Sequence, residues 1–372
     1  MLHRLWTGIT KKMRIAFVFV LLAGCSMIAP VKTENVTETL RSLAEKNGIY
    51  VGAAVNVEAL GKDERYSKIL AKEFSLITPE NSMKFNVIHP DRGRYDFSQA
   101  DALVDFAERY GMKVNGHVLV WDQQLPDWLT KNHFTKEELK AILHDHIRSV
   151  VSRYRGKVWS WDVAAEAVGG DGKLRDTFWS RGIGADYLEL AFRWVHEADP
   201  EAHLRYNDYG GEDMGPKSQG IYDLVARLRR KGVPIDGVGL QMHVELGNFP
   251  NEQDVRRNME RLAAIGLDSH ITEMDVSLPM PATADDFRAQ ARVYLNMLQA
   301  CLLASRCRSF STWGVTDRYS WIPESFPGLG DALLFDQDYQ PKSAYFSICS
   351  LLRDNAASKG QRVFRTFSRH YS

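Results

Sequence analysis

Two glutamates stand where a pair of carboxyl groups could carry out acid/base chemistry. Glu166 comes just after the apolar run Val158–Val163, and Glu273 follows the apolar run Ser269–Thr272. One member of such a pair can donate a proton to a leaving oxygen while the other acts as nucleophile or base, which is what hydrolysis of a glycosidic bond requires. A structural ion pair for each glutamate is the alternative interpretation. The aromatic residues around both segments favour the catalytic interpretation, because flat ligands stack on aromatic faces.

The elements that position these glutamates are predicted from eight short apolar runs that alternate with longer helical patterns. The spacing between runs leaves room for the crossover helix that parallel strands need. Capping boxes at Thr135 and Thr283 predict helices over Glu137–Arg148 and Phe287–Leu303. We therefore predict an α/β fold, a single (β/α)8 TIM barrel. Its predicted strands are Tyr50–Val55, Phe74–Thr78, Lys113–Trp121, Val158–Val163, Leu204–Tyr206, Gly237–Gln241, Ser269–Thr272 and Ser309–Trp313.

Polar and aromatic residues follow these strands in a way that fits a barrel. The functional groups of such a barrel lie at the C-terminal ends of its strands. We expect the residues at these ends to gather at one mouth, with Glu166 and Glu273 facing each other across it. They are Glu80, Asn81, Lys84, His117, Trp121, Glu166, Asn207, Asp208, Gln241, His243, Glu273, Trp313 and Trp321.

Taken in order, the segments at the strand ends resemble glycoside hydrolase family 10, the endo-β-1,4-xylanase family. Each segment alone is weakly specific, whereas the ordered set is very specific, and the resemblance covers residues 45–350. The matching segments are Thr78–Lys84, Gly116–Trp121, Tyr206–Tyr209, Gly239–His243, Ile271–Val276, Trp313–Asp317 and Leu334–Asp336.

The resemblance implies a role for each matching residue. Glu166 would be the acid/base and Glu273 the nucleophile of a retaining double displacement that needs no metal or cofactor. His243 resembles the histidine that orients the nucleophile. The residues that the resemblance places at the sugar subsites are Glu80, Asn81, Lys84, His117, Trp121, Gln241, Trp313 and Trp321.

The two glutamates need opposite protonation states for these roles. We expect Glu166 to be protonated because its site is partly desolvated and close to a second carboxylate. We expect hydrogen bonds and the nearby Lys84 to keep Glu273 ionised.

Three positions depart from the family pattern. Ala165 stands where an Asn ordinarily holds the 2-hydroxyl of the sugar being cleaved, Asp122 replaces a usual His, and Phe85 replaces a usual Trp. Loss of the Asn contact predicts a slower enzyme, because hydrogen bonds to the 2-hydroxyl strengthen in the transition state. The leading hypothesis is an endo-β-1,4-xylanase acting on xylan or xylo-oligosaccharides. The alternatives are a catalytically impaired glycan-binding lipoprotein and a hydrolase of another β-linked glycan.

The N-terminus has the pattern of an export signal. Basic residues precede the apolar run Ile15–Gly24, which is too short to span a membrane. The string Leu22–Cys25 resembles a bacterial lipobox, so we predict a signal peptide over residues 1–24, lipidation of Cys25 and a tether over residues 25–37. An ordinary secretory signal with an incidental Cys25 is the alternative. The lipobox interpretation predicts export and lipid anchoring to the bacterial cell envelope.

Three further cysteines fit an exported chain. Cys301 and Cys307 are separated by only five residues, so a disulfide between them is plausible. The resemblance supports this bridge, because part of the family has a disulfide there. Cys349 lies in an apolar stretch and is expected to be a buried free thiol.

Composition limits the classes of partner. The 372 residues include 47 basic and 47 acidic side chains, whereas a nucleic-acid surface usually shows a basic excess. The charge balance therefore argues against nucleic acid as a partner. The family resemblance implies xylan or xylo-oligosaccharides as the substrate, and the lipobox interpretation implies a membrane contact through the anchor. Residues 38–352 show no repeat or low-complexity tract and are predicted to form one catalytic domain, which we expect to be a monomer. Residues 353–372 are rich in basic side chains and are predicted to form a solvated tail.

Overall fold

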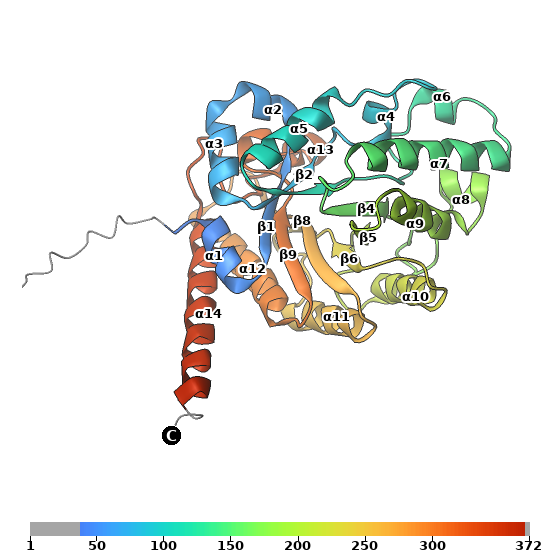
Figure 1. Cartoon of the computed structure of the whole chain (residues 1–372). Helices are drawn as coiled ribbons and strands as arrows, with labels where there is room; N and C mark the ends of the chain where they lie inside the picture. Colours follow the sequence, from blue (N-terminus) through green and yellow to red (C-terminus); the bar gives the residue numbers. More distant parts are fainter. Residues whose placement is uncertain (1–37, 369–372) are drawn as a thin grey trace, which may run out of the picture. The chain divides into compact units, whose positions relative to one another are not determined.

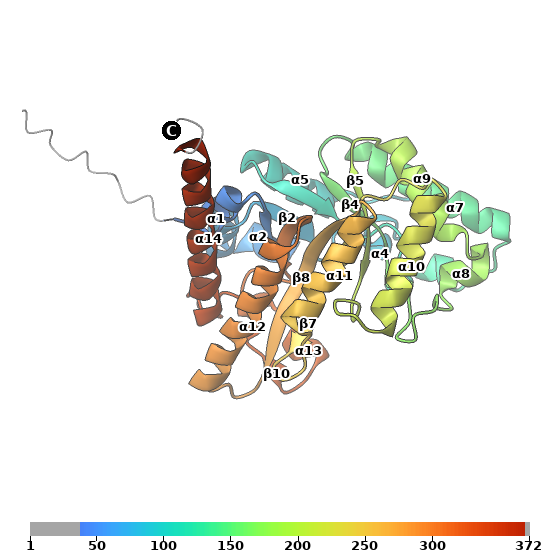
Figure 2. The same ribbon diagram turned by 90° about the horizontal axis from the view of Figure 1, so that it is seen from below.

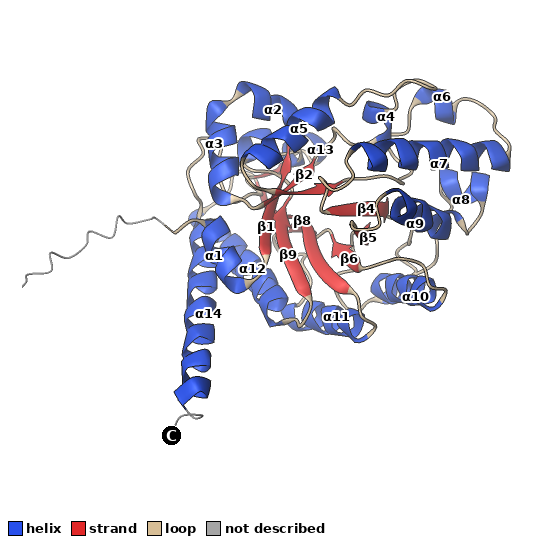
Figure 3. Ribbon diagram, viewed as in Figure 1, coloured by secondary structure: helices blue, strands red, loops and turns tan. Residues whose placement is uncertain are grey.

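The barrel predicted from the sequence is present in the computed structural model, which describes residues 38–368. The predicted signal peptide, Cys25 and the whole tether over residues 25–37 lie outside these residues. Helices surround a central closed sheet (Figures 1 and 3). The eight barrel strands are β1 (Tyr50–Val55), β2 (Leu76–Pro79), β3 (Lys113–Gly116), β4 (Ser160–Ala165), β5 (His203–Asp208), β6 (Gly237–Leu240), β8 (Asp268–Pro279) and β9 (Cys307–Thr312).

All eight strands pair in parallel with their neighbours. The order runs β8, β6, β5, β4, β3, β2, β1 and β9, and pairing of β8 with β9 closes the ring. Because parallel strands bring their carboxyl ends to one rim, the residues after each strand gather there. Two short strands extend β8 beyond the barrel: β7 (His243–Glu245) pairs with it in parallel and β10 (Leu329–Gly330) pairs antiparallel.

Two strands, β3 and β8, differ most from the predicted lengths. β3 ends at Gly116 instead of Trp121, because the register with β4 stops at Gly116 and the next backbone hydrogen bond to β4 is donated by Leu119 to Asp162 at 3.2 Å. The chain rejoins the sheet at Val120, which forms an isolated bridge with Ala164. β8 runs on to Pro279 because β7 and β10 supply hydrogen-bond partners beyond the rim.

The helices cover the outside of the barrel, and α11 lies between α10 and α12 (Figure 2). Both predicted capping boxes form, at Thr135 before α7 and at Thr283 before α12. The helices are α1 (Leu40–Asn47), α2 (Val57–Lys62), α3 (Glu64–Glu73), α4 (Phe85–Ile88), α5 (Ser98–Arg109), α6 (Asp127–Thr130), α7 (Lys136–Arg153), α8 (Phe178–Ile183), α9 (Tyr187–Ala198), α10 (Pro216–Arg230), α11 (Glu252–Ala264), α12 (Ala284–Leu303), α13 (Ile322–Ser325) and α14 (Ser343–Ser368), with a 3₁₀ turn at Asp317–Tyr319.

Most of the segment predicted as a basic, solvated tail is helical, and its described side chains are largely exposed. α14 crosses the predicted boundary at residue 352 without a break and runs alongside α1 (Figure 1). Arg353 contacts Glu38 at 2.8 Å, and Asn355 donates a hydrogen bond to Asn47 at 2.7 Å. These contacts with a distant segment explain why local composition did not reveal the helix. Among residues 38–368, no helix is long and apolar enough to cross a membrane.

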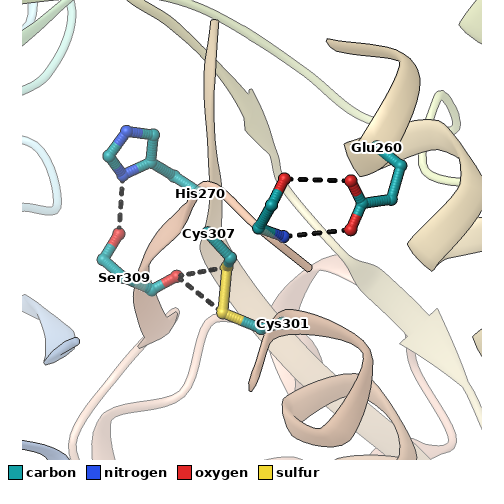
Figure 4. Close-up of a disulfide and its surroundings, with 6 residues drawn as sticks. Glu260, His270, Cys301, Cys307 and Ser309 are labelled. Carbon is teal, nitrogen blue, oxygen red and sulfur yellow. Dashed lines mark hydrogen bonds between the residues drawn. A yellow bond between two sulfur atoms is a disulfide. The ribbon is translucent and has the colours of Figure 1, made fainter. Parts of the chain in front are cut away.

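A disulfide joins Cys301 to Cys307, in agreement with the prediction (Figure 4). The bridge connects the end of α12 to the first residue of β9 and so fixes the turn between them. Cys349 is buried and free, also as predicted.

Candidate active site

A cavity of about 760 Å³ lies at the carboxyl ends of the strands. Every residue predicted for catalysis or sugar binding lines it. Tyr209 and Phe326 also line the cavity and were not predicted. The predicted lining residues are Glu80, Asn81, Lys84, His117, Trp121, Glu166, Gln241, His243, Glu273, Trp313 and Trp321.

The backbone at Glu166 has an unusual conformation that aims its side chain into the cavity. Its φ of 56° lies in the left-handed region, which a residue with a Cβ rarely adopts. Two contacts hold this turn: the Glu166 N–H donates to the carbonyl of Asn207 at 3.0 Å, and Arg175 Nη1 donates to the carbonyl of Glu166 at 2.9 Å. Arg175 is therefore a supporting residue that the sequence motifs did not reveal.

The Glu166 carboxyl group has the environment of a proton donor. Burial raises its pKa, and the negative charges of Asp208 and Glu273 raise it further. Gln241 donates to Oε1 at 3.4 Å, which opposes the rise without reversing it. The prediction that Glu166 is held protonated by desolvation and by a second carboxylate agrees with this geometry.

The Glu273 carboxylate accepts hydrogen bonds at both oxygens. Asn207 Nδ2 donates to Oε1 at 2.6 Å, and His243 Nε2 lies 3.1 Å from Oε2. Burial alone would raise the pKa of Glu273, but His243 and the nearby His117 outweigh burial and lower it. Glu273 is therefore the ionised member of the pair and is available as a nucleophile.

His243 is held as a cation between two carboxylates. Its Nδ1 lies 2.9 Å from Oδ2 of Asp275, and its Nε2 faces Glu273. Burial lowers the pKa of His243, but the two carboxylates outweigh burial and raise it to about 10. Both ring nitrogens are consequently donors, which fits the predicted role of orienting the nucleophile.

Lys84 was expected near Glu273, and burial lowers the pKa of Lys84 while the charge of Glu273 raises it. Its Nζ donates to Oδ1 of Asn81 at 3.0 Å and lies 5.0 Å from the centroid of the Trp121 ring. The Lys84 ammonium and the Asn81 amide thus lie next to the Trp121 ring. Such a combination suits a sugar, whose hydroxyls need partners and whose C–H face needs an apolar surface.

Two tryptophans build one wall of the cavity. Trp313 contacts His117 edge-on, with ring centroids 5.1 Å apart, and Trp321 contacts His243 in the same way at 5.1 Å. Trp321 Nε1 also donates to Oδ2 of Asp275 at 2.9 Å. The aromatic wall and the charged residues around the nucleophile therefore support each other.

The positions that depart from the family pattern lie at the edge of the site. Ala165 is buried in β4 in register with Asn207, and the Asn207 amide is committed to Glu273. Asp122 lies 4.0 Å from Arg175, and Phe85 is buried in α4. Neither Asp122 nor Phe85 lines the cavity. Asn207 was expected at the mouth of the barrel, but its hydrogen bond to Glu273 was not predicted.

The site contains the groups for acid-assisted displacement at a sugar carbon. A buried carboxyl group with a raised pKa and a carboxylate with a lowered pKa face one cavity lined by aromatic rings and amides. In the part of the chain that the structure describes, no three His, Cys, Asp or Glu side chains are grouped so as to hold a metal ion.

Comparison with known proteins agrees with this geometry. The family model "Glycosyl hydrolase family 10" matches residues 39–351. An endo-1,4-beta-xylanase B of Thermotoga neapolitana is 44% identical over 340 residues, which are 91% of this chain and 97% of the relative.

Solved structures give the same result. The crystal structure of native xylanase 10B from Thermotoga maritima superposes with a TM-score of 0.84 at 45% identity, covering 86% of this chain and all of the other. Xylanase 10B from Thermotoga petrophila RKU-1 in complex with xylobiose superposes with a TM-score of 0.83 at 45% identity, covering 86% and 98%. The chain belongs to glycosyl hydrolase family 10.

Proposed function

We infer that this protein is an endo-1,4-β-xylanase that hydrolyses internal β-1,4-xylosidic bonds of xylan or xylo-oligosaccharides with retention of configuration. The observation that carries this conclusion is the pair of buried carboxyl groups with opposite pKa shifts in one cavity, Glu166 raised and Glu273 lowered. Relatives named as endo-1,4-beta-xylanases and a similar structure holding xylobiose identify the sugar class.

The reaction proceeds in two displacements. In the first, a Glu273 oxygen attacks the anomeric carbon while Glu166 gives its proton to the departing glycosidic oxygen, so one C–O bond breaks and a glycosyl ester forms. In the second, the ionised Glu166 takes a proton from water, whose oxygen attacks the same carbon and releases Glu273. Two inversions at one carbon leave its configuration unchanged.

Release of new reducing ends from β-1,4-glycans tests the substrate. The full chain is expected to release them from xylan and xylo-oligosaccharides in preference to β-1,4-glucan and β-1,4-mannan. NMR of the first product should show the β-anomer before mutarotation. Preference for another glycan, or an α-anomer as first product, would contradict the proposal.

Two variants separate the roles of the glutamates. Glu273→Ala should lose activity on every substrate, because no covalent intermediate can form. Glu166→Ala should lose activity on xylan but retain hydrolysis of aryl xylosides with good leaving groups, which depart without a proton. Equal losses in both variants on activated aryl substrates would contradict the assignment.

The presence of Ala165 supports an alternative function, a glycan-binding protein, which the assay for release of reducing ends distinguishes from an enzyme. If loss of the 2-hydroxyl contact has abolished catalysis, the protein would bind xylo-oligosaccharides in the tryptophan-lined cavity without cleaving them. Calorimetric binding with no product after prolonged incubation is the outcome that would favour a glycan-binding protein over an enzyme.

We further propose that the protein is exported, lipidated at Cys25 and held at the bacterial cell envelope, and that it acts as a monomer. Support for the anchor comes from the basic N-terminus, the short apolar run and the string Leu22–Cys25. Cys25→Ser should abolish labelling with a fatty-acid probe and release the protein from membranes. Continued membrane attachment of this variant would contradict lipidation, and light scattering on the released protein measures its oligomeric state.

A further inference from the structure

A charged side chain lies inside the barrel, below the catalytic cavity. Arg205 is in the middle of β5, two residues before Asn207 and therefore on the same face of the strand. It is 1% exposed. Its Nε and Nη2 both donate to Oδ1 of Asp162, at 3.0 and 2.8 Å. Burial of a guanidinium here needs an explanation, because it loses its hydration.

The partner of Arg205 connects it to the active site. Oδ2 of Asp162 accepts a hydrogen bond from Asn115 Nδ2 at 2.8 Å and from His117 Nδ1 at 3.1 Å. Asp162 is fully buried; burial raises its pKa, but Arg205, His117 and Asn115 outweigh burial and lower it to about 2. Asp162 is thus an anion with one oxygen given to Arg205 and the other to the residues below the cavity.

His117 carries the effect of Asp162 to the nucleophile. Since an ionised carboxylate only accepts hydrogen bonds, the proton of the imidazole lies on Nδ1, and Nε2 is the nitrogen left for a bound sugar. The Nδ1 atom also lies 3.9 Å from Oε1 of Glu273. The negative charge of Asp162 raises the pKa of Glu273, opposing the effect of the two histidines. The positive charge of Arg205, which is paired with the other oxygen of Asp162, therefore also affects the pKa of the nucleophile.

Stability alone does not account for Arg205. A buried ion pair contributes little compared with apolar side chains of the same volume. The Arg205 Nη1 atom is buried without a hydrogen-bond partner among the described residues, which adds to the cost. A role in the chemistry of the site explains why a cation rather than an apolar side chain occupies this position.

We propose that Arg205 is a positioning residue of the active site that acts through Asp162: its guanidinium cancels the buried charge of Asp162, so that Asp162 orients His117 without placing a second net negative charge beside Glu273. This proposal rests on the retaining mechanism proposed above. It makes the protonation of Glu273 depend on a side chain that touches neither substrate nor nucleophile.

Several other titratable groups face the same carboxylate and belong to its electrostatic environment. Because they remain unchanged in a variant of Arg205, any shift in the pH profile of that variant reports the lost guanidinium charge. These groups are Lys84 after β2, His117 after β3, Asp162 and Glu166 of the β4 segment, His243 of β7 and Asp275 of β8.

The test is the pH dependence of kcat/KM for xylo-oligosaccharides in Arg205→Met. Loss of a fixed positive charge favours protonation of the groups around it, so the acid limb of the profile should move to higher pH by about one unit. At the optimum, kcat should fall about tenfold with KM changed much less, because the defect concerns the nucleophile. Arg205→Lys, which keeps the charge, should restore the position of the limb.

The double variant Arg205→Met/Asp162→Asn removes both charges and should return the limb to its wild-type position even though His117 loses its anionic partner. If the Met variant does not fold, Arg205→Gln, which keeps a donor for Asp162 but no charge, takes its place. A matched control is Arg308→Met, because Arg308 pairs with Asp268 at 3.0 Å at the opposite end of the barrel. This control should lower Tm without moving the limb.

An unmoved acid limb in folded Arg205→Met or Arg205→Gln would overturn the proposal, and so would an equal shift in Arg308→Met. NMR titration of the Glu273 side-chain carboxyl carbon gives a second readout that needs no substrate, and its midpoint should rise when Arg205 is neutralised. If the wild type does not cleave xylan, the proposed function fails, whereas an unchanged Glu273 titration would defeat the role of Arg205 alone.

Discussion

Burial acts on both catalytic carboxyl groups in the same direction, yet their pKa values move apart. Glu166 keeps the rise that burial imposes, because Asp208 and Glu273 add negative charge around it. Glu273 loses that rise, because His243 and His117 lie against its oxygens. The division of labour between two identical side chains therefore comes from their neighbours.

This difference predicts the shape of the pH profile. Activity on xylan should fall on the alkaline side as Glu166 loses its proton, and on the acid side as Glu273 gains one. With aryl xylobiosides that have good leaving groups, kcat/KM should lose its alkaline limb and keep its acid limb. Steady-state rates on both substrates across the pH range measure this, and an alkaline limb of equal position on both would contradict the assignment of Glu166.

Ala165 allows a gain-of-function prediction. Ala165→Asn should restore a hydrogen-bond donor for the sugar 2-hydroxyl, and because that contact strengthens in the transition state, kcat should rise more than affinity. A gain of about 1.4 kcal/mol would raise kcat/KM on xylo-oligosaccharides about tenfold. A clear fall on the natural substrate would instead show that Ala165 makes room for a substituted sugar.

At the level of elements, β6 shows how a glycine within a strand supports the site. A Cβ at Gly239 would lie 2.2 Å from Oδ1 of Asn207 and 2.9 Å from Cγ2 of Thr272. The Thr272 hydroxyl donates to that same Asn207 oxygen at 2.8 Å, which turns the Asn207 amino group toward Glu273. The missing side chain at Gly239 is therefore part of the support of the nucleophile.

Gly239→Ala should consequently reduce catalysis more than stability. Displacement of Asn207 weakens its hydrogen bond to Glu273 and should lower kcat/KM by at least about tenfold, or roughly 1.4 kcal/mol. Gly237→Ala is the control on the same strand, since its Cβ would meet the carbonyl oxygen of Asp268 at 2.9 Å, away from Asn207. It should lower Tm and leave kcat unchanged; the reverse ranking of the two variants would exclude this role for Gly239.

Apolar runs and capping boxes predicted these elements because both signals are local. All eight strands and the boxes at Thr135 and Thr283 are present. The end of β3 is set by its pairing with β4, and α14 contacts Asn47; both partners are distant in sequence. Likewise, the positions of Glu166 and Glu273 after apolar runs were enough to predict them as catalytic. The pairing of Arg205 with Asp162 could not be predicted, because it arises only when β4 and β5 lie side by side.

For the whole molecule, two buried histidines predict sensitivity to acid. His146 of α7 is fully buried against Phe85, with ring centroids 3.8 Å apart, and neither of its ring nitrogens has a hydrogen-bond partner in the described chain. Burial holds the pKa of His146 well below its usual value and lowers that of the neighbouring His89 to about 4. Both rings are therefore neutral in the folded protein near pH 6.

The sign of the effect follows from these depressed values. Above about pH 6.5, the pKa of a histidine in the unfolded chain, the two neutral rings make their full contribution to the free energy of unfolding. As the pH falls toward about 4, only the unfolded chain takes up protons, so the folded protein loses stability. His146→Leu should flatten the fall of Tm between pH 6.5 and 4 in calorimetry. His144→Leu, on the same helix but half-buried, should not. An unchanged slope in His146→Leu would assign the acid sensitivity to other groups.

The contact between α1 and α14 brings the beginning and the end of the described barrel together. Asn47 Nδ2 donates to the carbonyl of Leu352 at 2.8 Å, and Glu38 meets Arg353. A short linker from residue 359 to residue 38 would join the two, and the chain could then begin at the exposed Gly232 between α10 and β6. Such a circular permutant would keep every strand pairing while changing the order in which the strands are synthesised. Its catalytic rim would stay intact, because the new termini lie at the opposite end of β6.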